Sequence, residues 1–115
     1  MSRLARLAAS VTEPLLVTHG VNVRYLTGFQ SSNTAVLVEP GGEATLFTDF
    51  RYAEAARLVE GVTFVQTKRA VVSDLSERLA GRTIGFEANR IGFAPWEALG
   101  AGGVNHGLQI AHPAV

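Results

Sequence analysis

Apolar residues recur at helical spacing at the start of the chain and then gather in short runs. Leu4, Leu7, Ala8 and Val11 follow i, i+3, i+4, i+7 spacing, which predicts an amphipathic helix. Later apolar or alternating runs predict strands at 15–18, 36–39, 44–48, 62–66, 83–87 and 107–110. Because glycines lie in the short connection between the second and third runs, we expect that pair to form an antiparallel hairpin.

Helical patterns separate the later strands. The predicted helices cover 50–60, with Gly61 as the stop, a segment opened by Ser73 and closed by Gly81, and a segment beginning at Pro95. Strands that alternate with helices are typical of α/β folds, and the early hairpin makes the sheet mixed. The sequence therefore predicts an α/β domain with a mixed β-sheet of five or six strands flanked by helices.

The composition fits one compact domain and disfavours several partners. The 115 residues are 47% hydrophobic and 17% charged, which is enough apolar material for a core. Ten basic residues balance ten acidic ones, so neither nucleic acid nor a membrane surface is an expected partner. Cysteine is absent, and no apolar stretch approaches the roughly 20 residues that cross a bilayer. We expect a cytoplasmic protein.

Residues that could hold a metal ion or act as nucleophiles are few and scattered. Asp49 and Asp74 are the two aspartates, and each begins a predicted helix, where a carboxylate accepts backbone N–H groups. His19, His106 and His112 show none of the spacings typical of metal sites, and no serine lies in a G-x-S-x-G pattern. The sequence therefore predicts no metal ion, no cofactor and no catalytic residue in this chain.

Two segments carry a resemblance to a known family. They are VNVRYLTGF at Val21–Phe29 and TDFRYAEAA at Thr48–Ala56. With the order of the predicted elements, they resemble the N-terminal domain of the creatinase, prolidase and aminopeptidase P family of metallopeptidases. The likeness spans nearly all of residues 1–115, and it implies the creatinase N-terminal fold, with its ribonuclease H-like motif.

The resemblance implies a role beside a second domain. In that family this domain precedes a larger "pita-bread" catalytic domain, which binds two divalent metal ions of the Mn or Co type and cleaves the bond before proline. That catalytic domain is absent from the sequence, so we expect the chain to be inactive alone. The implied partners are its own catalytic domain, a second copy in a homodimer and, in the whole enzyme, a proline-containing peptide.

The resemblance also points to one loop. The family's loop after the YLTGF segment lies near the active-site mouth, often that of the partner subunit, and here it corresponds to Phe29, Gln30, Ser31, Ser32 and Asn33. An apolar wall beside small hydrogen-bonding groups suits a substrate pocket. The loop lacks the charged residues with which some members bind a substrate carboxylate. The alternative, a polar turn that only leads into the next strand, is equally open.

Other notable residues are expected to be structural. Tyr25 is expected to pack in the core, and Tyr52 lies on the apolar face of the predicted helix. Arg51 is expected to pair with Glu54 along that helix. Trp96 is either a core residue or part of a subunit contact.

Two other functions remain open. The chain could be a free-standing interaction domain that kept this fold without a catalytic partner. It could also be a signalling receiver domain phosphorylated on Asp49, although Thr18 and His19 occupy the place of the acidic pair that binds Mg²⁺ there. The only lysine, Lys68, also does not lie near the fifth predicted strand.

Overall fold

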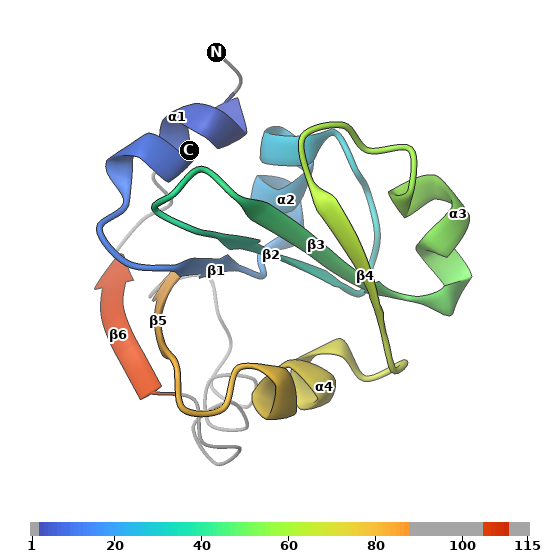
Figure 1. The fold of residues 1–115 in the computed structure, drawn as a ribbon. Helices are drawn as coiled ribbons and strands as arrows, with labels where there is room; N and C mark the ends of the chain where they lie inside the picture. The colour runs from blue at the N-terminus through green and yellow to red at the C-terminus, as the bar shows by residue number, and fades with distance from the viewer. Residues whose placement is uncertain (1–2, 88–104, 111–115) are drawn as a thin grey trace.

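The computed structural model describes residues 3–87 and 105–110 of the chain (Figure 1). Its helices are α1 (Arg3–Ser10), α2 (Gly20–Thr27), α3 (Ala53–Ala56) and α4 (Val71–Arg78), with a 3-10 helix η1 (Phe50–Tyr52). Its strands are β1 (Leu15–Val17), β2 (Thr34–Val38), β3 (Ala44–Asp49), β4 (Thr63–Thr67), β5 (Thr83–Glu87) and β6 (Asn105–Ile110). The predicted helix at Pro95, with Trp96, and His112 lie outside the described residues.

The strands form one mixed sheet in the order β4-β3-β2-β1-β5-β6. The predicted hairpin is confirmed, because β2 pairs antiparallel with β3 and also with β1. The outer pairs β3–β4, β1–β5 and β5–β6 are parallel. Val36 lies between Val17 and Leu46 in this register, so the centre of the sheet is lined by aliphatic residues.

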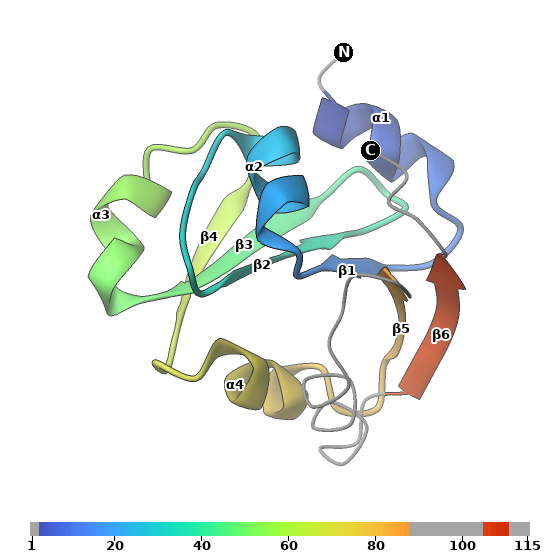
Figure 2. The ribbon, with the colours of Figure 1, turned by 180° about the vertical axis from the view of Figure 1, so that it is seen from behind.

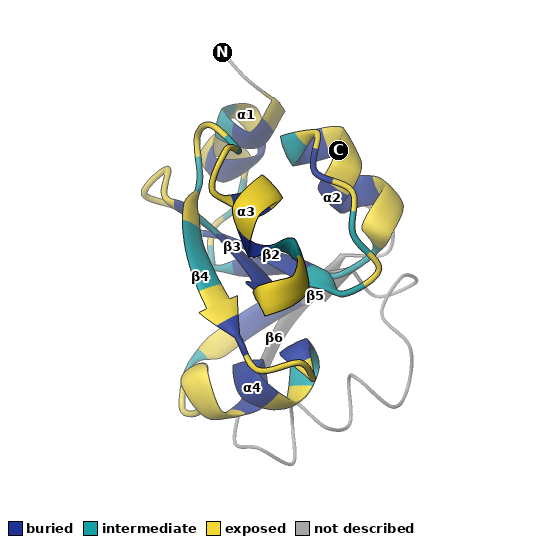
Figure 3. Ribbon diagram, turned by 90° about the vertical axis from the view of Figure 1, so that its right-hand side faces the viewer, coloured by how far each residue is buried: buried dark blue, intermediate teal, exposed yellow. Residues whose placement is uncertain are grey.

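Helices cover both faces of the sheet. Helices α1, α2 and α3 lie on one side and α4 on the other (Figures 1 and 2). Since strand side chains alternate between faces, Val36 and Val38 of β2 contact the first group, whereas Ala35 and Leu37 contact α4. All four are buried. Figure 3 shows the centre of the sheet in the dark blue of buried residues. This two-sided burial explains why β2 reads as a continuous apolar run rather than an alternating one.

The first helix is confirmed, but two other predicted helices have different bounds. Instead of one helix over 50–60, the chain forms η1 and the short α3. Leu58 and Val59 then donate to carbonyls three residues back, which tightens the turn and ends the helix before Gly61. The second helix starts at Val71 rather than at Ser73, because the Asp74 N–H donates to the Ala70 carbonyl and closes a first helical turn that includes Val71.

Removal of a central core side chain should unfold this domain more readily. Leu46 is fully buried in the cluster beneath α1–α3, so we expect Leu46→Ala to lower the free energy of unfolding by about 2–5 kcal/mol. The matched control is Leu58→Ala, which removes a side chain that is 79% exposed and should cost less than about 0.5 kcal/mol. Urea unfolding measures both; equal losses would contradict the assignment of the core.

Candidate functional site

The predicted loop begins at a sharp turn after α2. Gly28 has φ +76°, a left-handed conformation that glycine adopts without strain, and its N–H caps the Arg24 carbonyl. The Thr27 hydroxyl donates to the Val23 carbonyl and accepts the Phe29 N–H. Phe29 is consequently turned into the core, where it is only 6% exposed. Its ring supports the loop from below more than it forms an open wall.

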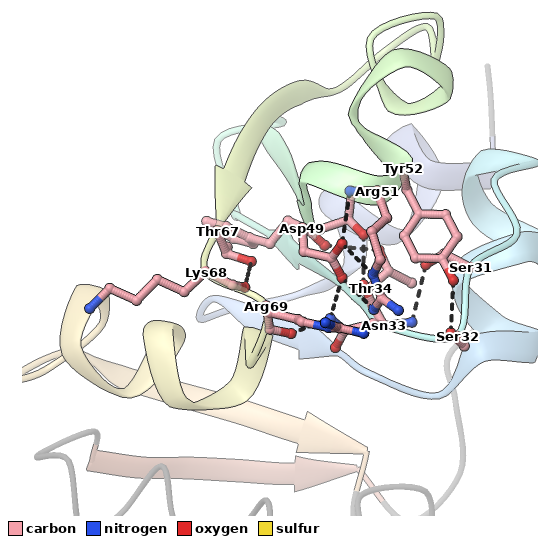
Figure 4. Close-up of polar contacts among 12 residues, drawn as sticks. Ser31, Ser32, Asn33, Thr34, Asp49, Arg51, Tyr52, Thr67, Lys68 and Arg69 are labelled. Carbon is pink, nitrogen blue, oxygen red and sulfur yellow. Dashed lines mark hydrogen bonds and ion pairs between the residues drawn. The ribbon is translucent and has the colours of Figure 1, made fainter.

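Asn33 ties this loop to two others. Its Nδ2 donates to Asp49 Oδ2 and to the backbone carbonyl of Arg69, both at 2.5 Å (Figure 4). Its own backbone carbonyl accepts the Thr48 hydroxyl at 2.6 Å, and its N–H donates to Ser31 Oγ at 3.1 Å. One amide side chain thus joins the loop before β2, the end of β3 and the β4–α4 connection.

Asp49 is the acceptor at the centre of this arrangement. Its side chain is fully buried at the end of β3. Oδ1 accepts the backbone N–H and Nε of Arg51, each at 2.9 Å, and Oδ2 accepts Arg51 Nη2 at 2.8 Å. The Arg51 guanidinium holds the pKa of Asp49 well below its ordinary value, with further help from Asn33, and outweighs the opposing effect of burial.

The Asp49 contacts confirm one expectation and correct another. The aspartate accepts a backbone N–H at the start of a helical turn, as predicted. Arg51 pairs with Asp49 rather than with Glu54. The reason is geometric: the extended backbone of Asp49 points its carboxylate back over the first turn, so the guanidinium reaches a buried anion two residues away.

A second contact holds the outer part of the loop. Ser32 Oγ lies 2.9 Å from the Tyr52 hydroxyl, and this hydrogen bond lowers the pKa of Tyr52. The Tyr52 ring packs against the core, as its place on the apolar face predicted, and Arg51 lies over it at 5.3 Å from the ring centre. The exposed Ser32 is therefore anchored to the segment that also supplies Arg51.

The loop borders a shallow open hollow of about 530 Å³. The residues that line it are Thr27, Gly28, Phe29 and Gln30 from the loop side and Ala55, Leu58, Val59 and Glu60 from the end of α3. Gln30 is exposed at its rim, and Leu58 is the most exposed large apolar side chain among the described residues. The loop thus offers solvent an amide, a hydroxyl and an apolar neighbour, which are groups suited to contact rather than to catalysis.

The other aspartate is structural. Burial raises the pKa of Asp74. The Lys68 N–H at 2.9 Å and the Arg78 guanidinium at 3.2 Å together lower it by more, so the pKa of Asp74 lies below its ordinary value. These bonds fix the start of α4 against β4. Among the side chains that the structure describes, no group of three or more His, Asp or Glu could hold a metal ion.

One predicted core residue is on the surface. Tyr25 is 44% exposed, because it lies on the outer side of α2. Arg3 covers it instead: the guanidinium is 4.2 Å from the ring centre and donates to the Tyr25 carbonyl at 3.3 Å. The expectation of core packing is wrong for Tyr25, although its neighbour Leu26 is buried.

The loop's supports were only partly visible in the sequence. The segment 29–33 and the TDFRY motif were both singled out, but nothing indicated that Asn33 and Asp49 are bonded to each other or that the Arg69 carbonyl completes the set. One signal was present: Asp49 lies two residues before Arg51, and a guanidinium can form two parallel hydrogen bonds with a nearby carboxylate.

A comparison with family models gives the identity of the domain. Residues 3–105 match the Creatinase/Prolidase N-terminal domain. This match covers most of the chain, and the sheet and helices described above fit it. The chain belongs to the Creatinase/Prolidase N-terminal domain family, as the resemblance implied.

Relatives agree in sequence and structure. The chain is 32% identical over 91 residues to the uncharacterized peptidase YqhT of Bacillus subtilis, a match that covers 76% of this chain but only 26% of that protein. The N-terminal domain of the cytoplasmic peptidase PepQ from Mycobacterium tuberculosis is 34% identical with a TM-score of 0.72, covering 95% of this chain and 88% of that one.

A third relative has the same fold. It is the creatinase/prolidase-like N-terminal domain of a protein described as a metallopeptidase from Corynebacterium diphtheriae, with 30% identity, a TM-score of 0.73 and coverage of 97% and 92%. The fold class predicted above is thereby confirmed. The receiver interpretation is not supported, because Asp49 is buried and bonded to Arg51 in a domain of another family. Within the described part of the chain, no helix is long and apolar enough to cross a bilayer.

Stability should fall in acid through Asp49. A carboxylate whose pKa is depressed by folding stabilises the domain fully above its unfolded pKa of about 4, and this contribution is lost as the pH falls below it. We therefore expect Asp49→Asn to be less stable than the parent at pH 7, with a shallower loss of stability between about pH 5 and pH 2. Urea unfolding across that range measures both slopes.

The Asp49→Asn variant keeps part of the acid sensitivity, because the pKa of Asp74 is depressed in the same direction. The control is Glu54→Gln, which removes an exposed acidic side chain on α3 and should leave the acid slope close to that of the parent. An unchanged slope in Asp49→Asn would show that the buried ion pair does not set the acid limit.

Proposed function

We propose that this chain is the non-catalytic wall of an Xaa-Pro dipeptidase or aminopeptidase-type metallopeptidase. In this proposal the loop Phe29–Asn33 borders the active site of a catalytic domain and limits which proline-containing peptides reach it. The chain spans about a quarter of the length of the peptidase YqhT, so the hydrolytic chemistry is assigned to a separate catalytic domain. A homodimer and a cytoplasmic location are further parts of the proposal.

The observation that carries the proposal is the fixation of the loop. Hydrogen bonds hold it at both ends, through Thr27 at Phe29 and through Asn33 at Asp49 and Arg69. Gln30 and Ser32, between these anchors, are exposed. A loop that is rigid yet presents polar groups outward suits a surface that selects by shape, because little entropy is lost when a ligand contacts it.

Metal chemistry belongs to the proposed catalytic domain. A hard two-metal site needs several converging carboxylates, usually with histidine, to bind the ions that activate water. The described residues contain no such group, and both aspartates are already engaged by arginine and backbone N–H groups. We therefore derive no hydrolytic step from this chain.

The isolated chain should not respond to the family's metals. We expect that Mn²⁺ or Co²⁺ leaves its melting temperature unchanged and that it does not cleave Ala-Pro, because no donors converge. Differential scanning calorimetry with and without each ion measures the first, and an EDTA-treated sample controls for trace metal. A large metal-dependent rise in melting temperature, or cleavage of Ala-Pro, would overturn the assignment of the chain as a non-catalytic domain.

The loop should affect substrate size in a protein that contains both domains. In the polypeptide that joins this chain to a catalytic domain, we expect Asn33→Ala to raise KM for an Xaa-Pro dipeptide and to narrow the preference between dipeptide and longer peptides, while kcat changes less. The reason is that the Asn33 side chain is bonded to Asp49 and to the Arg69 carbonyl, and thereby positions the loop.

The matched control for this experiment is Thr83→Ala, an exposed side chain at the start of β5. It lies at the opposite end of the sheet from the end of β3, because β5 runs parallel to β3. It should leave the substrate preference unchanged. If Asn33→Ala and Gln30→Ala both leave the preference for peptide length unaltered, the chain does not form a wall of the active site. That outcome would favour the interpretation as a separate interaction domain.

A further inference from the structure

Strand β4 is an outer strand of the sheet, and its own residues do not protect its free edge. It reads TFVQT, with no charged residue or proline, although natural edge strands are usually blunted by such residues. Phe64 and Val65 are only partly buried, and Thr63 and Gln66 are exposed. Figure 3 shows this exposed and half-buried strand at the margin of the sheet. Such an edge is a template for another strand.

The hydrogen bonds of neighbouring side chains show which backbone groups point outward. The Gln66 carbonyl accepts Arg78 Nη2 at 3.4 Å, and the Lys68 N–H donates to Asp74. Since the N–H and C=O of one strand residue point to the same side, the groups of Phe64 and Gln66 face away from β3. Val65 lies midway between these two residues with outward-facing groups.

Charges are divided between the two ends of the strand. Glu60 precedes β4, and Glu43 lines the same surface hollow as Thr63 at its start. Lys68 and Arg69 directly follow its end. The Lys68 ammonium lies 3.6 Å from the Glu77 carboxylate of α4, and the Arg69 side chain is exposed. An antiparallel copy would place the acidic start of one strand against the basic end of the other, twice by symmetry. A parallel copy would oppose like charges.

We propose that β4 pairs antiparallel with β4 of a second copy of this chain, about a two-fold axis at Val65. In this register the outward N–H and C=O of Phe64 face those of Gln66 in the second copy. By symmetry, the same groups of Gln66 face Phe64 of the second copy, so all five residues of each strand lie opposite a residue of the other. Val65 would meet its own equivalent, and Glu60 would lie close to Arg69 of the second copy. A partner strand would replace the long Arg78–Gln66 bond.

This inference gives a surface to the homodimer of the proposed function and depends on that part alone. Whether the loop limits substrate access is a separate question, so failure of either proposal leaves the other standing. A single pair of short strands buries less than the roughly 1,200 Å² typical of stable complexes, so the isolated chain should associate weakly and in a concentration-dependent way.

Disulfide capture tests the register, because the natural chain contains no cysteine. We expect Val65→Cys to form a disulfide-linked dimer in a glutathione buffer, since non-hydrogen-bonded antiparallel neighbours bring their Cβ atoms to about 4.5–5.5 Å. Thr63→Cys is the matched control: it is the more exposed position, but it would face Thr67 of the other copy. Non-reducing mass spectrometry measures the rates.

If disulfides formed by random collision, Thr63→Cys would form dimers faster than Val65→Cys, because Thr63 is more accessible than Val65. Equal or faster dimer formation by Thr63→Cys, or none by either variant, would overturn the proposed pairing. Circular dichroism of both variants shows that the fold is kept.

Charge reversal provides an independent test by sedimentation velocity. We expect Glu60→Lys to weaken self-association roughly fivefold, and the double variant Glu60→Lys/Arg69→Glu to recover it, because the swap restores opposite charges at both symmetric contacts. Both side chains are exposed, so the fold should tolerate the changes. A monomer at every concentration, or a dimer indifferent to Glu60→Lys, would exclude this surface.

Discussion

The arrangement of the candidate site depends on one buried charge. The Asp49 carboxylate has no exposed surface, and an ionised group in that position is tolerated only when it is paired and fully hydrogen-bonded. Arg51 supplies the opposite charge and Asn33 supplies the remaining donor. Because Asn33 also binds the Arg69 carbonyl, satisfying this carboxylate positions three loops at once. The loop therefore has a fixed shape without having a large core of its own.

The sheet explains why these loops meet. Strands β3 and β4 are parallel, so their carboxyl ends lie at the same end of the sheet. The antiparallel β2 begins at that end. The segments that follow β3 and β4 and the loop that precedes β2 are thereby neighbours in space (Figure 4). The helices bury both faces of the sheet, whereas this end of the sheet carries polar contacts. A support of this kind suits a domain that shapes a site while another domain performs the chemistry.

Family membership and the described side chains both support the proposed separation of this domain from a catalytic domain. The chain belongs to the Creatinase/Prolidase N-terminal domain family and covers about a quarter of the peptidase YqhT. Its described acidic residues are either engaged in structural bonds or dispersed, and no group of them could bind a metal ion. The surface does offer an ordered polar loop and an outer strand without charged residues or proline. In the two proposals above, these are the features that contact a peptide and a second copy of the chain.

The strands, the hairpin, the first helix and the family could be predicted from the sequence, because they follow from local periodicity, glycine positions and two motifs. The sequence also pointed to the loop Phe29–Asn33, whose role at a substrate stays a prediction. The partner of Arg51, the exposure of Tyr25 and the end of α3 depend on the folded structure and could not be predicted. The physical reason is that a side chain chooses among nearby partners by burial and distance. Asn33 and Asp49, sixteen residues apart, become neighbours only once β2 and β3 have paired.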